Sequence, residues 1–90
     1  MTRESHIEKR VCAAAAANGW LVHPKAAHGT RGWPDRTFST VGRLIFVEFK
    51  APGKKPTPLQ THTHLGLRAK GYEVFVIDSV EAGRGIFEQC

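Results

Sequence analysis

The centre of the chain reads RLIFVEFK over residues 43–50. Residues 44–47 are apolar at every position, which is typical of a strand that is buried on both faces. Side chains two apart on a strand share a face, so Glu48 and Lys50 should project together while Phe49 points into apolar packing. A carboxylate and an ammonium group at the end of a buried strand are costly unless they are paired or used. Glu48 and Lys50 are therefore candidate functional residues.

The sequence on either side predicts further helices and strands. Thr2 is a plausible N-cap for the first helix, which contains the helix-favouring run of alanines at residues 13–17. Pro58 suits the first position of a second helix. The expected elements are a helix over residues 3–18, strands over 20–23, 34–40 and 43–50, a helix over 58–70, a strand over 72–77, and a short helical turn capped by Asp78-Ser79 before Gly83.

The order of these elements predicts an α/β fold with a mixed four-stranded sheet flanked by helices, in the order αβββαβ. The first three strands are close in sequence and favour an antiparallel meander. The helix over residues 58–70 is long enough to act as a crossover, which would place the last strand parallel to the central one. We expect residues 1–90 to form a single domain, since the sequence shows no linker, repeat or low-complexity segment.

Composition narrows the class of protein. Thirteen Lys and Arg against eight Asp and Glu give a formal charge of +5, and this basicity favours a nucleic-acid partner over an acidic cation store. The only cysteines, Cys12 and Cys90, cannot build a secreted disulfide framework and lack zinc-ligand spacing. The charged N-terminus does not resemble a signal peptide, and no apolar run reaches membrane-spanning length. We expect a cytoplasmic protein with no membrane contact.

Asp35 ends the loop GTRGWPD and precedes the central strand by one hairpin. If the two strands pair, Asp35 can come close to Glu48, and a divalent cation would relieve the repulsion between the two carboxylates. Oxygen ligands of this kind suit Mg²⁺ or Mn²⁺. Lys50 would then orient or deprotonate a water molecule, or stabilise charge on a phosphate. The alternative is a plain Glu48–Lys50 ion pair with Asp35 in an unrelated turn.

Several residues in the flanking loops could contact DNA phosphates, although solvated loop charge is the alternative. Trp33 could stack on a base, but packing beneath its own loop is favoured. His62 and His64 lie two apart on a helix and point nearly opposite ways, so they should not share an ion and are expected to be ordinary. The candidate phosphate contacts are Lys25, His28, Arg31, Arg36, Lys54 and Lys55.

Pro34-Asp35 followed by Glu48-Phe49-Lys50 resembles the PD-(D/E)XK nuclease signature. Three longer stretches make the chain similar to the small VRR-NUC nucleases within that superfamily, and the resemblance runs from Glu4 to about Glu81. These stretches are GTRGWPDR at residues 29–36, FVEFKAPGKKPTPLQ at residues 46–60 and LRAKGYEVFVIDS at residues 67–79.

The resemblance implies a restriction-endonuclease-like fold and hydrolysis of phosphodiesters with a divalent metal. By position, it implies metal ligation by Asp35, Glu48 and the carbonyl of Phe49, with Lys50 as the catalytic lysine. Gln60 matches a glutamine on the second helix of the family. The family also carries an acidic residue on the first helix, which could be Glu4 or Glu8.

Single-domain members of this family resemble archaeal Holliday-junction resolvases. We therefore expect a homodimeric, structure-selective DNA endonuclease that uses Mg²⁺ or Mn²⁺, in a bacterial or phage-infected cytoplasm. Two alternatives stay open. One is a nuclease directed at flaps or nicks, and the other is a basic DNA-binding module without catalytic activity.

Overall fold

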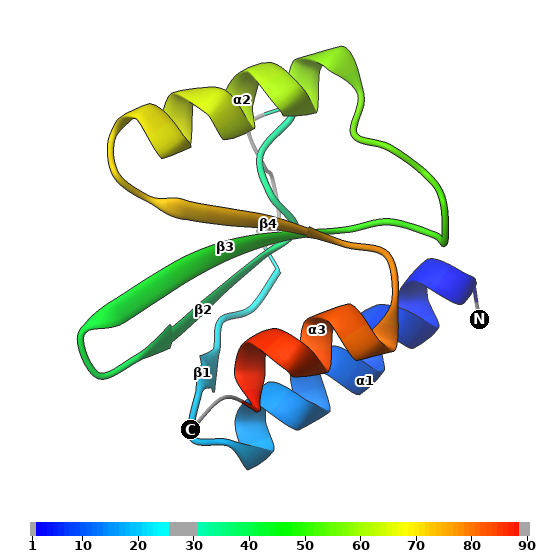
Figure 1. Cartoon of the computed structure of the whole chain (residues 1–90), viewed down its shortest axis with the longest axis vertical. Helices are drawn as coiled ribbons and strands as arrows, with labels where there is room; N and C mark the ends of the chain where they lie inside the picture. The colour runs from blue at the N-terminus through cyan, green and yellow to red at the C-terminus, as the bar shows by residue number, and fades with distance from the viewer. Residues whose placement is uncertain (1, 26–30, 89–90) are drawn as a thin grey trace.

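A mixed four-stranded sheet forms the centre of the computed structural model, which describes residues 2–25 and 31–88. Two helices cover one face of the sheet and a third helix covers the other (Figure 1). The elements are α1 (Arg3–Ala17), β1 (Leu21–Val22), β2 (Arg36–Thr40), β3 (Arg43–Phe49), α2 (Pro58–Ala69), β4 (Glu73–Ile77) and α3 (Val80–Phe87). On Figure 1, α1 and α3 lie together beneath the sheet and α2 lies above it.

The strand order is β1-β2-β3-β4. The pairs β1–β2 and β2–β3 are antiparallel, with Phe38 opposite Ile45, and β3–β4 is parallel, with Glu48 opposite Val76. The predicted meander and the predicted crossover through α2 are both confirmed. The crossover brings the carboxyl ends of β3 and β4 to the same edge of the sheet, beside the N-terminal ends of α1 and α2 (Figure 1).

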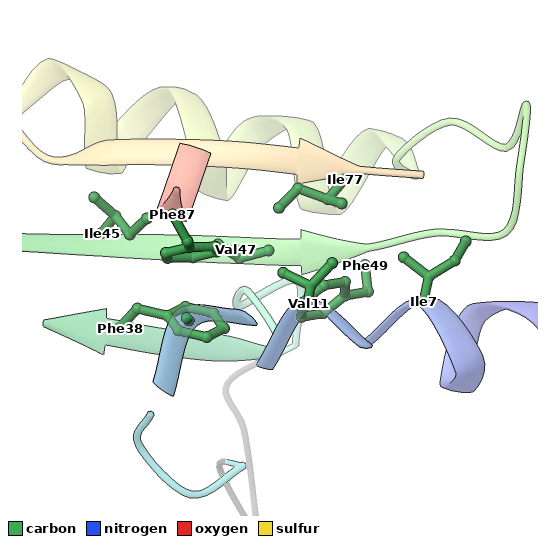
Figure 2. Close-up of a cluster of buried hydrophobic side chains, with 9 residues drawn as sticks. Ile7, Val11, Phe38, Ile45, Val47, Phe49, Ile77 and Phe87 are labelled. Carbon is green, nitrogen blue, oxygen red and sulfur yellow. The ribbon is translucent and has the colours of Figure 1, made fainter. Parts of the chain in front are cut away.

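The main hydrophobic core lies between the sheet and the pair α1 and α3. Figure 2 shows side chains from both helices and from β2, β3 and β4 meeting in this layer. The ring centroid of Phe87 lies 4.6 Å from that of Phe38 and 5.1 Å from that of Trp20. Cys12 is half-buried and packs at the margin of this core. The fully enclosed residues of this layer are Val11, Ala15, Phe38, Ile45, Val47 and Phe49.

The last helix is longer than predicted. In place of one short turn before Gly83, α3 starts after the N-cap Ser79 and runs to Phe87, which adds a final helix to the αβββαβ order. Gly83 is where α3 meets α1, because a Cβ at this position would lie 2.3 Å from Val11 Cγ2. Glycine weakens a helix, but here it allows the close helix–helix contact that buries Phe87.

The other predicted bounds are close to the observed ones. Thr2 is the N-cap of α1, as expected, and its side chain accepts a hydrogen bond from the Ser5 amide. Pro58 is at the start of α2, where Thr57 and Gln60 also form a capping box. The second strand starts at Arg36, two residues later than predicted, and the first strand is only two residues long. Across the described residues, no helix has both the length and the apolar character needed to span a membrane.

The prediction that β3 is buried on both faces is wrong for its first half. Leu44, on the α2 side, is 40% exposed, and Phe46 is only half-buried. The burial of this face is completed towards the end of the strand, where Glu48 is 2% exposed. Trp33 is 39% exposed and packs edge-to-face on Phe46 of β3, with 5.7 Å between ring centroids, so its packing partner is a strand residue and not its own loop. The most enclosed residue on this face is therefore the carboxylate.

Candidate active site

The β2–β3 hairpin brings the two predicted carboxylates together. Arg36 pairs with Val47 as the last step of the ladder, so Asp35 stands one step further on, opposite Glu48. The Asp35 carboxylate is fixed there because its Oδ2 accepts a hydrogen bond of 2.8 Å from the Phe49 amide. The hairpin predicted that Asp35 would lie next to the central strand. The hydrogen bond from the Phe49 amide fixes its carboxylate there.

The loop before Asp35 rests on the first half of α2. Gly32 has a φ of 84°, and a Cβ there would lie 2.9 Å from Thr63 Oγ1 and 3.0 Å from the Leu59 carbonyl oxygen. Both the backbone conformation and the lack of space require glycine at this point. This contact holds the loop against α2 just before the chain enters β2.

Three side chains surround the buried Glu48 carboxylate. Gln60 Nε2 donates a hydrogen bond of 3.2 Å to Glu48 Oε2, and Lys50 Nζ lies 3.8 Å from the same oxygen. His64 approaches from the next turn of α2, with its Nε2 at 3.9 Å from Glu48 Oε1. The predicted residues Asp35, Glu48, Lys50 and Gln60 therefore meet at one place, on the α2 side of the sheet.

His64 is the residue that the sequence analysis missed. It is 1% exposed and faces Glu48, whereas its neighbour His62 is exposed. The two histidines therefore differ in burial, and the enclosed position of His64 beside Glu48 was not expected from the sequence. Its four-residue spacing from Gln60 was the available signal, because residues four apart share one face of a helix.

The surroundings of Glu48 disfavour its ionised form. Burial and, after it, the charge of Asp35 and a hydrogen bond with Asp35 together raise the pKa of Glu48 to about 8, against the opposing effect of the Lys50 ammonium. The charge of Glu4, on the first turn of α1, also raises this pKa. The site therefore concentrates negative charge that a cation would neutralise.

Comparisons with known proteins point to a nuclease. A solved structure described as a VRR_NUC domain superimposes with a TM-score of 0.87 at 31% identity, covering 99% of this chain and 98% of that chain. A protein of Acyrthosiphon pisum secondary endosymbiont phage 1, named "Putative nuclease p44", is 42% identical over 80 residues, which is 88% of this chain and 86% of the phage protein. The chain belongs to the VRR-NUC family of nucleases. No protein-family model matches it.

The two acidic residues on the first helix of this VRR-NUC nuclease have different surroundings. Glu8 is buried, and its carboxylate lies 2.9 Å from Arg36 Nε and 3.1 Å from Lys25 Nζ. Glu4 is exposed, and its charge acts on the pKa of Glu48. Glu8 is therefore engaged in a structural ion-pair cluster, whereas Glu4 is available to the carboxylate site.

The donor set of the site fits a hard divalent cation. Among the described residues, Glu48 Oε1 is buried without a hydrogen-bond partner, and a carboxylate oxygen in that state lacks the positive group that would offset its burial. Within the same part of the chain, no three His, Cys, Asp or Glu side chains are grouped closely enough to hold a metal. Mg²⁺ commonly takes only one or two carboxylates and completes its shell with water and substrate oxygens, so the pair Asp35 and Glu48 is sufficient.

The predicted phosphate contacts fall into two groups. Lys25 and Arg36 are paired with Glu8, and Arg36 Nη1 also donates to the His23 carbonyl oxygen. The others follow or precede the site in the sequence and are exposed. These are Arg31, Lys54 and Lys55; His28 lies outside the described residues.

A cavity of about 560 Å³ lies apart from the carboxylates, between the start of α1 and the start of α3. The cavity is lined by apolar side chains and by basic and acidic ones, including Arg3, His6 and Asp78. Asp35, Glu48 and Lys50 do not line this space, so the candidate site and this cavity are formed by different residues.

Proposed function

We propose that this VRR-NUC nuclease is a divalent-metal-dependent DNA endonuclease that acts as a homodimer on branched DNA such as Holliday junctions. The observation that carries the proposal is the buried Glu48 carboxylate beside Asp35, with Oε1 unpartnered among the described residues and Lys50 at its edge. A purely structural ion pair would not leave an enclosed carboxyl oxygen unsatisfied.

Asp35, Glu48 and the Phe49 carbonyl would hold Mg²⁺ or Mn²⁺. When bound, such an ion supplies Lewis-acid charge for a phosphate oxygen and lowers the pKa of water. Asp35 is fixed by the Phe49 amide and Glu48 by Gln60, so both carboxylates are oriented before substrate arrives. The Lys50 ammonium stands close enough to hydrogen-bond a nucleophilic water or a non-bridging phosphate oxygen. Glu4, in the first turn of α1, adds a further negative charge near the site.

DNA binding is assigned to the exposed basic loops on either side of the site. Arg31 lies four residues before Asp35, and Lys54 and Lys55 follow Lys50 in the loop between β3 and α2. That loop begins at the carboxyl end of β3 (Figure 1), directly after Glu48 and Lys50 in the sequence. Basic side chains in these places would contact phosphates without reading sequence, as a structure-selective enzyme requires.

A homodimer is supported by apolar surface around α2 and β4. Exposed side chains there include Leu59, Leu65, Tyr72 and Val76, and oligomerisation is a common way for small domains to gain buried area. A two-fold dimer would present two equivalent sites to two equivalent strands of a junction. The dimer and the branched substrate are therefore proposed together.

The deciding experiment is cleavage of a labelled four-way junction with Mg²⁺, Mn²⁺ or EDTA, beside flap, nicked and linear duplex substrates. We expect metal-dependent cutting that favours the junction, loss of cutting in Asp35→Ala with binding retained, and normal cutting in the exposed control Glu81→Ala. Wild-type protein that binds every substrate and cuts none would favour the non-catalytic DNA-binding module. Preference for flaps or nicks, or full activity on linear duplex from a monomer in sedimentation, would refute the junction proposal.

A further inference from the structure

Two buried polar atoms face each other beneath the nuclease site without a partner. In the part of the chain that the structure describes, Glu48 Oε1 and His64 Nε2 both lack a hydrogen bond, and they are 3.9 Å apart. A separation of 3.9 Å is too long for a hydrogen bond. Each such group costs free energy when it is enclosed and unsatisfied, so this arrangement needs an explanation beyond packing.

The location of His64 links it to Gln60. Both residues are on α2, one helical turn apart, and both approach the same carboxylate. Gln60 already donates to Oε2, so the free oxygen Oε1 is the one that His64 faces. Burial lowers the pKa of His64, and the charges of Arg68 and Lys50 lower it further against the opposing charge of Asp35. The geometry supports a donor role, since an imidazole Nε2 can carry an N–H and act as a donor to the oxygen that it faces.

We propose that His64 is a positioning residue for the nuclease site, and that its Nε2–H donates a hydrogen bond to Glu48 Oε1 when Glu48 holds a divalent ion. Together with Gln60, it would hold both carboxylate oxygens from one helix and fix the direction in which Glu48 presents its charge. This inference rests on the proposed metal-dependent function. Groups that hydrogen-bond metal-ligating carboxylates commonly change metal affinity or activity by about 10–100-fold when they are removed.

A merely structural histidine would behave differently. Replacing a buried, unpartnered polar side chain with an apolar one of similar size is nearly neutral or stabilising, and would leave metal affinity unchanged. A donor that acts on Glu48 would be replaced functionally by glutamine, whose side-chain amide can also offer an N–H. The exposed His62 on the same helix provides a matched control.

The experiment is isothermal titration of the full chain with Mn²⁺ in the absence of DNA, together with junction cleavage. We expect His64→Leu to weaken Mn²⁺ binding by about tenfold or more, His64→Gln to stay within about threefold of wild type, and His62→Leu to match wild type. The melting temperature of metal-free His64→Leu should equal or exceed that of wild type. If the leucine variant does not fold, His64→Met gives the same comparison, because methionine adapts to irregular gaps.

Wild-type Mn²⁺ affinity in His64→Leu would overturn the inference while leaving the proposed function intact. Equal losses in His64→Leu and His64→Gln would also overturn it, because volume and not the donor would then be responsible. A wild-type chain that neither binds Mn²⁺ nor cuts DNA would refute the proposed function, and this inference with it.

Discussion

Gln60 connects the start of α2 to Glu48. Its Nε2 donates to Glu48 Oε2 at 3.2 Å, and its Oε1 accepts from the Thr57 amide at 2.8 Å. One side chain therefore closes the helix cap and orients a carboxylate of the proposed nuclease site. The capping box fixes the rotamer of Gln60, so the orientation of Glu48 depends on how α2 begins.

This double role predicts that two cap variants will separate stability from activity. Thr57→Ala and Gln60→Met each break the capping box and should each cost about 1 kcal/mol in the free energy of unfolding. Only Gln60→Met removes the donor to Glu48, so its cleavage rate should fall by about tenfold or more while that of Thr57→Ala is retained. Thermal melts and junction cleavage measure the two effects. Equal cleavage rates in the two variants would contradict the assignment of Gln60.

The raised pKa of Glu48 predicts that metal-free protein loses stability as pH rises. Between about pH 4.5 and 8 the folded chain keeps a proton on Glu48 that the unfolded chain has released. The stabilisation from this proton is complete below about pH 4.5 and is lost as pH rises through about 8. Melts in EDTA should therefore show Glu48→Gln more stable than wild type by about 4 °C or more at pH 8.5, and by less at pH 5. Mg²⁺ should narrow the gap at pH 8.5, and parallel pH curves for the two proteins would refute this account.

The first-helix acids should respond in opposite ways to substitution. Glu8→Gln removes ion pairs with Arg36 and Lys25 from a buried position and should cost about 1–3 kcal/mol of stability. Glu4→Gln should leave the melting temperature unchanged, because the side chain is exposed, and should lower Mg²⁺-dependent cleavage. Melting curves and cleavage rates on the same preparations test both statements. Loss of cleavage without loss of stability in Glu8→Gln would reverse the assignment.

The contact between α1 and α3 predicts that alanine in place of Gly83 will destabilise the fold, whereas alanine in place of Gly85 will not. Gly83→Ala would place a Cβ 2.3 Å from Val11 Cγ2 and should destabilise the fold by about 1–3 kcal/mol. Gly85→Ala meets nothing within 4 Å and should stabilise α3 by up to about 1 kcal/mol. Denaturant unfolding measures both variants, and adding Val11→Ala should relieve the strain of Gly83→Ala. A Gly83→Ala protein as stable as wild type would mean that the helices are not in close contact.

The sequence alone determined the sheet topology and the carboxylate pair. Strand periodicity placed Glu48 and Lys50 on one face, and the short turn between the strands required the hairpin that brings Asp35 opposite Glu48. These are local consequences of strand geometry, which the chain encodes over a few residues. The family resemblance added Gln60, which the structure places at Glu48.

Only the tertiary structure showed the surroundings of Glu4, Glu8 and His64 and the length of the final helix. Glu8 pairs with Arg36, which is 28 residues away in sequence. His64 on α2 faces Glu48 on β3. Gly83 continues a helix because Val11 packs against it from another helix. Burial and pairing of this kind depend on which surfaces meet in space, and no local pattern in the chain specifies them.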